Sequence, residues 1–416
     1  MKNKLGKEAG KLFFLCFIAY MFSYFGRYDF SACQNAMIKA GVIDLSTAGT
    51  IASAYFVCYG AGQLINGAVG VHVSPKYMIA CGLFGVGIVN ILMGVCPWSL
   101  GLIIIWGLNG LFNSMLWSPI IRAFSEWMDA PSRERAGADI SLTIPFGTLG
   151  SYVVSSLALS HGNWRLVFYI SGALILLCGV VWTIGMGTLS EHITRMSAEA
   201  DKAAPAAKCA PKKKAGLSPA VFFGTGLTLV AVSIIFNGAL KEAVIQNIPQ
   251  LMIDNFGVSD SFASLISTCV PLVGIIGPYA AIWLDKKFLH NECYTAAAFY
   301  GVSLISMVVI ALSGLRSSWL TLICLALSTA AMWGVNTIML TYLSYHYGSM
   351  GLSSAVSGTL NCFVYIGSAV CAKGYGVAIS NTGWQVTSYI WCGVAAAAVL
   401  ASIAAGIVWK RKQPAA

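Results

Sequence analysis

Two basic residues lie inside long hydrophobic runs of this chain, and together they could hold an anion. Arg27 interrupts the run that begins near residue 12, and Lys241 occupies a similar place in the run 221–253. On insertion scales a charged side chain at the centre of a bilayer costs roughly 2.5 to 3.5 kcal/mol, and such residues are functional by default. We therefore predict that Arg27 and Lys241 jointly bind an anion.

A phosphate group has the chemistry that such a pair would recognise. At neutral pH a phosphate monoester carries about −1.5 to −2 charges and presents three strong acceptor oxygens. Arginine offers a planar fork that binds two of these oxygens at once, whereas lysine supplies a compact point charge. The two cations together can orient and neutralise one phosphate.

Aromatic residues near the first cation extend this predicted site. Tyr20, Tyr24 and Arg27 have the spacing i, i+4, i+7, which places them on one face of a helix. Tyr59 and Tyr365 lie in other hydrophobic runs, and tyrosine hydroxyls can donate hydrogen bonds to phosphate or sugar oxygens. Trp117, close to Pro119, is a candidate for the wall of a cavity.

Each of these residues also has a structural interpretation. Arg27 could pair with Asp29 or Glu242 and join two spans, and Lys241 is adjacent to Glu242. The tyrosines could pack in the core or anchor the membrane interface. Trp117 is equally compatible with a place in the core.

The composition indicates a polytopic membrane protein. Of the 416 residues, 57% are hydrophobic and 10% are charged, and the mean hydropathy is +0.76, which excludes an ordinary soluble protein. The 13 cysteines are scattered without a C-x-x-C pair, so neither a disulfide framework nor a metal site is predicted. The net charge of +10 resides in loops on one side, which argues against nucleic acid as a partner. The first run is too long for a cleavable signal peptide.

The hydrophobic runs predict an all-α membrane protein with twelve transmembrane helices in two six-helix pseudo-repeats. We expect a first bundle at 1–187, a flexible cytoplasmic linker at 188–217 and a second bundle at 218–416. The first six spans are expected at 12–38, 47–70, 77–95, 100–121, 137–160 and 164–187. The second six are expected at 219–253, 262–284, 293–312, 319–343, 354–379 and 384–409.

The distribution of basic residues predicts the orientation of these spans. Counted by predicted loop, 19 of the 25 Lys and Arg residues lie on the side that carries both termini. By the positive-inside rule this side is the cytoplasm. Two bundles related by an axis along the membrane normal would place Arg27 and Lys241 on facing helices across a central cavity.

Several motifs along the chain resemble those of a known transporter family. The run from Tyr24 to Phe30, YFGRYDF, is similar to the first-helix signature of the organophosphate:phosphate antiporters of the major facilitator superfamily. Lys241 falls where that family keeps its second phosphate-binding cation. Further matches are Tyr59-Gly60, Asn109-Gly110, Trp117-Ser118-Pro119, Arg133-Glu134-Arg135, Asn163-Trp164-Arg165, Asn361 and Tyr365. The resemblance implies that Asn361 and Tyr365 face the substrate.

The sequence departs from the family at several positions around the expected substrate. The loop after the second span has Val71 where the superfamily has an acid, and Asp285 is kept in the second half. Tyr28, Gln63 and Phe146 stand where glycerol-3-phosphate carriers have basic or histidine side chains. We therefore expect phosphorylated sugars or other organophosphates rather than glycerol-3-phosphate.

The resulting hypothesis is a secondary active transporter, not an enzyme, that exchanges a phosphorylated organic solute for inorganic phosphate without a cofactor or metal. It would be a monomer in a bacterial inner membrane. One alternative is a proton-coupled organic-anion carrier with Asp29, Asp139 or Glu242 as the proton site. The other is a transporter-like membrane sensor of sugar phosphate.

Overall fold

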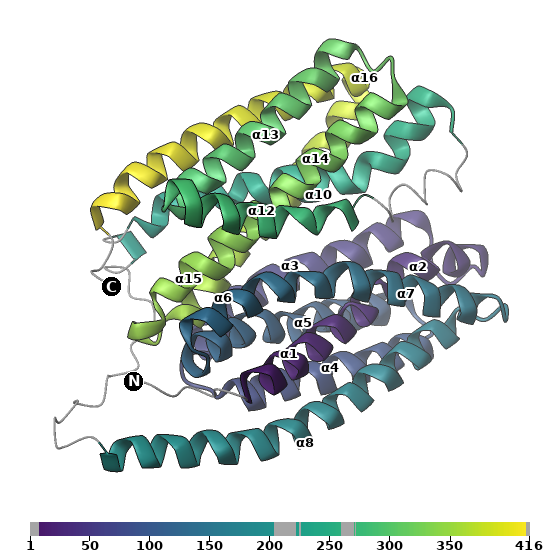
Figure 1. Ribbon diagram of the computed structural model, residues 1–416. Coiled ribbons are helices and arrows are strands. Elements are labelled where there is room, and N and C mark those ends of the chain that lie inside the picture. Colours follow the sequence, from purple (N-terminus) through teal and green to yellow (C-terminus); the bar gives the residue numbers. More distant parts are fainter. Residues whose placement is uncertain (1–7, 204–221, 224–225, 259–269, 271, 413–416) are drawn as a thin grey trace. The chain divides into compact units, whose positions relative to one another are not determined.

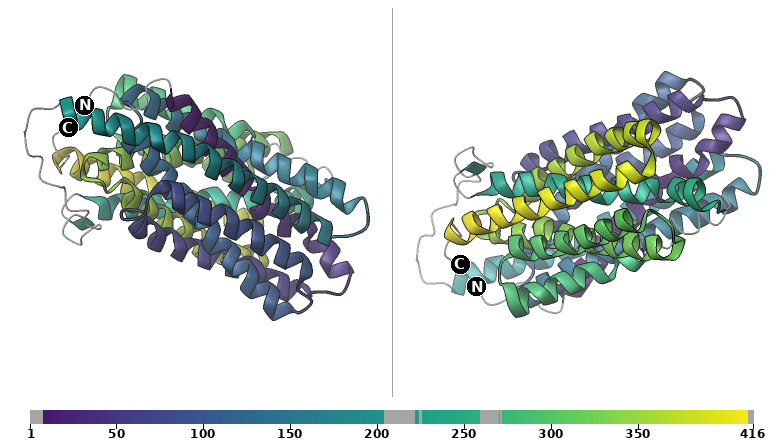
Figure 2. Two further views of the ribbon diagram at one scale, coloured as in Figure 1. Left: turned by 90° about the horizontal axis from the view of Figure 1, so that it is seen from below. Right: turned by 90° about the horizontal axis from the view of Figure 1, so that it is seen from above.

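The computed structural model describes residues 8–203, 222–223, 226–258, 270 and 272–412, and these residues form helices joined by short turns. They group into two compact units. The first comprises the described part of Met1–Gly216 together with Tyr347–Gly358, and the second comprises the described part of Leu217–His346 together with Thr359–Ala416. Each unit is an assembly of helices (Figures 1 and 2).

The first unit contains the Arg27 region. Its helices are α1 (Ala9–Ser23), α2 (Phe25–Lys39), α3 (Leu45–Val69), α4 (Pro75–Val95), α5 (Ser99–Trp127), α6 (Ala130–Asp139), α7 (Thr143–Leu159) and α8 (Arg165–Ala203). Helix α5 packs against α3 and α4, while α8 lies along α4 and α2 packs against α7. The short 3₁₀ segments Ile140–Leu142 and Gly348–Met350 also belong to this unit.

The second unit contains the Lys241 region. Its helices are α10 (Leu227–Phe256), α12 (Ile276–Leu284), α13 (Glu292–Ser313), α14 (Ser318–Asn336), α15 (Leu343–His346) and most of α16 (Ser353–Lys412), with π-helical turns at Asp285–Leu289 and Thr337–Tyr342. Helix α14 packs against α10, α12 and α13. Helix α16 is two helices that meet at Gly383, whose φ of 77° ends the first of them.

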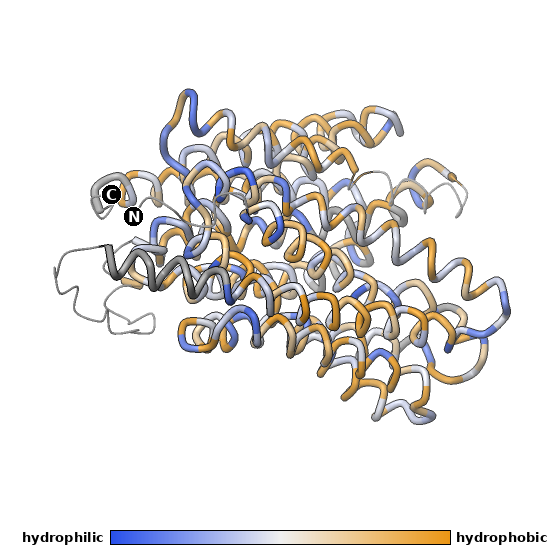
Figure 3. The backbone as a smooth tube through the Cα atoms, turned by 60° about the horizontal axis from the view of Figure 1, so that its bottom comes forward, coloured by the Kyte–Doolittle hydropathy of each residue, from blue (hydrophilic) through white to orange (hydrophobic). Residues whose placement is uncertain are grey.

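The apolar character expected of spans follows the helices. Nine helical segments among the described residues are long and apolar enough to cross a membrane. Apolar residues extend along most helices, and hydrophilic residues concentrate at turns (Figure 3). Part of the predicted span 262–284 lies outside the described residues.

Two helices differ in detail from the predicted spans. The first predicted span contains α1 and α2, which meet at Tyr24, whose amide donates to the Met21 carbonyl three residues back at 3.1 Å, and the segment Ala9–Gln34 is long and apolar enough to cross a membrane. Helix α8 does not end near 187 but continues to Ala203. Its last turns contain Ala, Glu, Lys and Met, which are good helix formers. The rest of the predicted linker lies outside the described residues.

Carbonyl groups at and just after the end of α3 accept hydrogen bonds from an arginine of α5. Arg122 of α5 is 6% exposed, and its guanidinium donates to the carbonyls of Gly70 and Val73, the latter at 2.8 Å. It also forms an ion pair with Glu126 at 2.8 Å. A cation near the last carbonyls of a helix is favourable, so Arg122 links α5 to the C-terminus of α3.

Candidate functional site

The guanidinium of Arg27 lies among four tyrosine rings in the first unit. The distances from its Cζ to the ring centroids are 5.1 Å for Tyr59, 5.6 Å for Tyr24, 6.0 Å for Tyr28 and 6.0 Å for Tyr55. Separations up to about 6 Å allow an attractive cation–π interaction. Arg27 itself is half-buried. The rings therefore stabilise a cation where a bilayer would disfavour one.

The aromatic set continues from Arg27 toward α5. Tyr20 contacts Tyr24 edge-on with ring centroids 5.4 Å apart, and it contacts Trp117 at 5.1 Å. Tyr20, Tyr24, Tyr59 and Trp117 are each at most 7% exposed. The structure thus brings these four predicted residues together with Arg27. Their role in binding a substrate stays a prediction.

Two close helix contacts hold Arg27 and its rings in place. The amide of Asn109 on α5 donates to the Gly26 carbonyl at 2.6 Å, directly before Arg27. A Cβ atom at Gly26 would lie 2.6 Å from the Asn90 side chain, and one at Gly110 would lie 2.3 Å from the Tyr55 carbonyl oxygen. At Gly110 the neighbouring atoms are backbone atoms, so only glycine permits this approach, which resembles the small-residue contacts of membrane helices.

Sequence reasoning missed Tyr55, which completes the ring set. Tyr55 and Tyr59 have the spacing i, i+4 on α3, and their rings stack with centroids 5.8 Å apart. That spacing was the available signal.

The Tyr55 hydroxyl, the Gln63 amide nitrogen and the Trp117 indole nitrogen are buried without a hydrogen-bond partner in the described structure. Such donors are rare in native proteins and require an explanation.

Asp29 does not pair with Arg27. Its Oδ1 accepts hydrogen bonds from the hydroxyls of Ser171 at 3.1 Å and Ser151 at 3.4 Å, on α8 and α7. Two residues along a helix turn the side chain by about 200°, which explains why Arg27 and Asp29 point to different neighbours. The interpretation that Asp29 neutralises Arg27 is therefore wrong. The side chain of Glu242, the other suggested partner, lies outside the described residues.

In the second unit, Lys241 lies on α10 next to polar residues that the sequence did not reveal. Asn237, one turn earlier, is fully buried, and its amide donates to Asn336 Oδ1 on α14 at 3.3 Å. Helix α16 approaches α10 closely, because a Cβ at Gly238 would lie 1.8 Å from the Val364 carbonyl oxygen. This contact places the buried α16 residues Asn361 and Tyr365 on a helix adjacent to that of Lys241.

Arg27 and Lys241 therefore belong to different units. Each has polar or aromatic neighbours within its own unit that suit an anion. The joint site that they would form stays a prediction.

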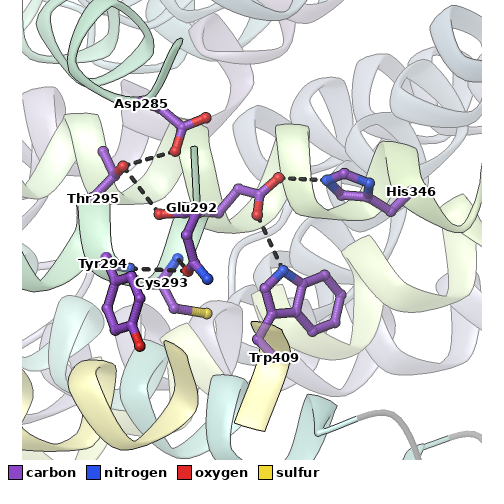
Figure 4. Close-up of polar contacts among 8 residues, drawn as sticks. Asp285, Glu292, Cys293, Tyr294, Thr295, His346 and Trp409 are labelled. Atoms are coloured by element: carbon purple, nitrogen blue, oxygen red, sulfur yellow. Dashed lines mark hydrogen bonds and ion pairs between the residues drawn. The ribbon is translucent and has the colours of Figure 1, made fainter. Parts of the chain in front are cut away.

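A separate polar cluster joins helix ends in the second unit (Figure 4). Glu292, at the start of α13, forms an ion pair with His346, the last residue of α15, and accepts a hydrogen bond from the Trp409 indole of α16 at 3.1 Å. Asp285 accepts from the Thr295 hydroxyl at 2.7 Å. Burial raises the pKa of Asp285, while the Thr295 hydrogen bond lowers it. These contacts satisfy one another, so we interpret the cluster as structural.

Sequence comparison places the chain in one superfamily. Residues 12–372 match the family described as Major Facilitator Superfamily. A "Probable hexose phosphate transport protein" of Chlamydia trachomatis is 26% identical over 171 residues, which are 41% of this chain and 38% of the relative. The chain thus covers well under two thirds of that relative's length. A "Glycerol-3-phosphate transporter" of Haemophilus influenzae is 29% identical over 34% of this chain and 30% of its own.

A relative that matches most of the chain is named as a sensor and not as a transporter. The "Membrane sensor protein UhpC" of Escherichia coli is 23% identical over 408 residues, covering 94% of this chain and 88% of the relative. These relatives support the predicted resemblance to the organophosphate:phosphate antiporter family.

Solved structures show the same fold at low identity. The transporter FucP in its outward conformation aligns with a TM-score of 0.71 and 13% identity, over 94% of this chain and 98% of FucP. The human organic anion transporter MFSD10 aligns with a TM-score of 0.68 over 95% and 99% of the two chains, also at 13% identity. The chain is thus a multi-pass membrane protein that belongs to the Major Facilitator Superfamily, and these structural neighbours are transporters, not enzymes.

Proposed function

We propose that this protein is a secondary active transporter that exchanges a phosphorylated organic solute for inorganic phosphate by alternating access. The observation that carries the proposal is the Arg27 guanidinium surrounded by tyrosine rings in the first unit. Relatives named for the transport of hexose phosphate and glycerol-3-phosphate support the same class of solute.

In this proposal Arg27 supplies the orienting contact and Lys241 the second charge. The arginine fork binds two phosphate oxygens with short, charge-assisted hydrogen bonds. Lys241, from the other unit, contributes a point charge that balances the remaining negative charge. The tyrosine hydroxyls near Arg27 can donate to the other oxygens, while their rings form an apolar wall.

The buried donors without partners support a solute larger than inorganic phosphate. The Tyr55 hydroxyl, the Gln63 amide and the Trp117 indole each present a hydrogen atom with no acceptor in the described structure. Leaving one buried donor unsatisfied costs about 1 to 3 kcal/mol. Oxygen atoms of a sugar or similar polyol are suitable acceptors, so these residues would contact the organic part of the ester.

The two cations also suggest why transport would be exchange. Their repulsion in an empty cavity grows as water leaves, because Coulomb energy varies inversely with the local dielectric constant. A bound phosphate group cancels this repulsion and bridges the units, so the loaded protein would change conformation more readily than the empty one. Net movement without a counter-solute would then be slow.

Counterflow in proteoliposomes tests this proposal. Vesicles loaded with inorganic phosphate should take up labelled phosphate or hexose phosphate, and Arg27→Ala and Lys241→Ala should each abolish the exchange. Lys39→Ala is the matched control, because it removes an exposed positive charge from the same helix as Arg27. Wild-type rates in correctly inserted Arg27→Ala and Lys241→Ala proteins would refute the mechanism.

A second candidate function is favoured by one observation. The relative named a membrane sensor matches 94% of this chain, more than the hexose phosphate and glycerol-3-phosphate transporters do. The alternative is thus a sensor that binds a sugar phosphate without moving it. Saturable binding of hexose phosphate to the purified protein, combined with no counterflow in sealed vesicles, would favour the sensor.

We further propose a monomer in a bacterial inner membrane with both termini in the cytoplasm. The bias of basic residues toward the loops on the terminal side supports this orientation, and the relatives are bacterial. Reporter fusions at the C-terminus that are active only in the cytoplasm test the orientation.

A further inference from the structure

Asp29 is a carboxylic acid that the proposed phosphate site does not use. It is 0% exposed and lies on α2, two residues after Arg27. Its side chain is directed toward α7 and α8, where it meets Ser151 and Ser171. It lies within a segment long and apolar enough to span a membrane.

The surroundings of Asp29 contain too few donors for a carboxylate. Only Oδ1 is hydrogen-bonded, and the Ser151 hydroxyl is equally close, at 3.4 Å, to the Phe25 carbonyl. Oδ2 is buried without any partner, and no Lys or Arg of the described residues lies within ion-pair distance of it. The charged form is therefore left with two neutral hydroxyls on one oxygen.

Other ionisable side chains do not supply the missing charge. Cys33, on the same helix, is the titratable neighbour, and its thiol donates to the Asp29 backbone carbonyl at 3.0 Å. Tyr152 on α7 packs its ring on Tyr28 instead. Ionisable residues on the other helices packed against α2 have partners elsewhere: Lys11 with Glu8, Lys76 with Ser190, Arg122 with Glu126, Arg165 with the Gly94 carbonyl, and Tyr55 and Tyr59 with Arg27.

An ionised carboxylate in such a place is poorly compensated. Removing an ion from water is repaid only by a counter-charge or by a full set of hydrogen bonds, and a group that lacks both is neutralised. Carboxylic acids inside membrane segments commonly serve as proton carriers. The geometry therefore favours a protonated Asp29 in this conformation.

We propose that Asp29 is a proton-binding site, and that its proton is bound together with the anion on Arg27. The carboxylate takes up one proton from water to become a carboxylic acid and returns the same proton when water reaches the contact of α2 with α7 and α8. The linkage to the anion rests on the proposed function.

The linkage follows from the position of Asp29 within one turn of Arg27. When the proton leaves, a negative charge appears near the cation and weakens its hold on an anion. Two unit charges about 10 Å apart, at an effective dielectric constant of about 20, interact strongly enough to change an affinity roughly tenfold. Because linkage is reciprocal, the bound anion strengthens proton binding by the same factor.

Infrared spectroscopy of the purified protein tests proton binding directly. Near neutral pH the wild type should show the C=O stretch of a protonated carboxyl that is absent from Asp29→Asn. Asp44→Asn should keep that band, because Asp44 is an exposed residue that caps α3 and asparagine can also cap. Identical spectra for wild type and Asp29→Asn would overturn the proposal. If the asparagine variant does not fold, Ser171→Ala should shift the band, and an unshifted band would overturn it.

Phosphate affinity at two pH values tests the linkage. On a change from mildly acidic to mildly alkaline pH, the wild type should lose roughly ten times more affinity for phosphate than Asp29→Asn does. Asp44→Asn should behave as wild type and corrects for the ionisation of phosphate itself.

Equal losses of phosphate affinity in wild type and Asp29→Asn would overturn the linkage. An affinity that follows sodium concentration instead of pH would overturn the proton as the ligand. A wild type that binds no phosphate at any pH would refute the proposed function, while the infrared result still judges Asp29.

Discussion

Replacing Arg27 by lysine separates the role of charge from the role of shape at the proposed phosphate site. The variant keeps one positive charge within reach of Tyr24 and Tyr59, whose ring centroids lie 5.6 and 5.1 Å from the wild-type guanidinium. It removes the planar fork. Since lysine also interacts with aromatic faces, most of the cation–π attraction should remain in both the empty and the loaded protein. The main loss is therefore one hydrogen bond to the phosphate.

The size of that loss can be estimated. A hydrogen bond between charged groups contributes about 1.5 to 3 kcal/mol, and about 1.4 kcal/mol corresponds to a factor of ten in affinity. Arg27→Lys should thus raise the Kd for phosphate roughly 10-fold to 150-fold. Lys241→Arg is the matched exchange, and we expect a much smaller change, because lysine is the native residue there and arginine retains the charge.

Isothermal titration of purified protein with phosphate measures both values. Circular dichroism and the unfolding temperature should show that the variants are folded. The reasoning would be refuted by an unchanged Kd for Arg27→Lys, or by a larger loss for Lys241→Arg than for Arg27→Lys. Either result would mean that the fork of Arg27 does not hold the phosphate.

Three further results are expected. Tyr55→Phe should weaken hexose phosphate binding roughly 3-fold to 10-fold, as expected for one hydrogen bond, while phosphate alone binds as before; equal weakening of both would contradict contact with the organic part. Glu292→Gln should lower the stability by about 0.5 to 1 kcal/mol, measured by thermal unfolding, because it weakens the contact with His346, whose side chain is partly exposed; an unchanged unfolding temperature would contradict this. Hydrogen bonds from the side chain and from the amide of Thr47 lower the pKa of the Asp44 carboxyl. The stability that Asp44 contributes is therefore present above the ordinary aspartate pKa and is lost as pH falls through the lowered value; Asp44→Asn should abolish this acid dependence of unfolding, and an identical pH profile would contradict the assignment.

The grouping of Tyr20 and Tyr24 with Arg27 could be predicted from the sequence, because its signals were local, whereas their role in binding stays a prediction. Tyr20, Tyr24 and Arg27 share a helix face by spacing alone, and the cost of a charge in a membrane marked Arg27 as important. The break between α1 and α2 at Tyr24 was not predictable from hydrophobicity, since the run continues through it.

The partners of single polar residues were harder to predict. The sequence left a pairing of Asp29 with Arg27 open as an alternative, and the structure shows that Asp29 contacts serines that lie more than a hundred positions later. Asn237 likewise meets Asn336 across two helices. Periodicity shows which side of a helix a residue occupies, but not which neighbour that side contacts, because helix packing in a bundle decides the partner.

Asn109 and Gly110 are consecutive, and they fix two different helices. The first holds the turn that carries Arg27, and the second allows the backbone of α3 to touch α5 at Tyr55. Two consecutive residues of α5 thus contact the helix that carries Arg27 and the helix that carries Tyr55 and Tyr59. A bulkier residue at position 110 would push the backbone of α3 away from α5 at Tyr55, and so would disturb the rings beside Arg27.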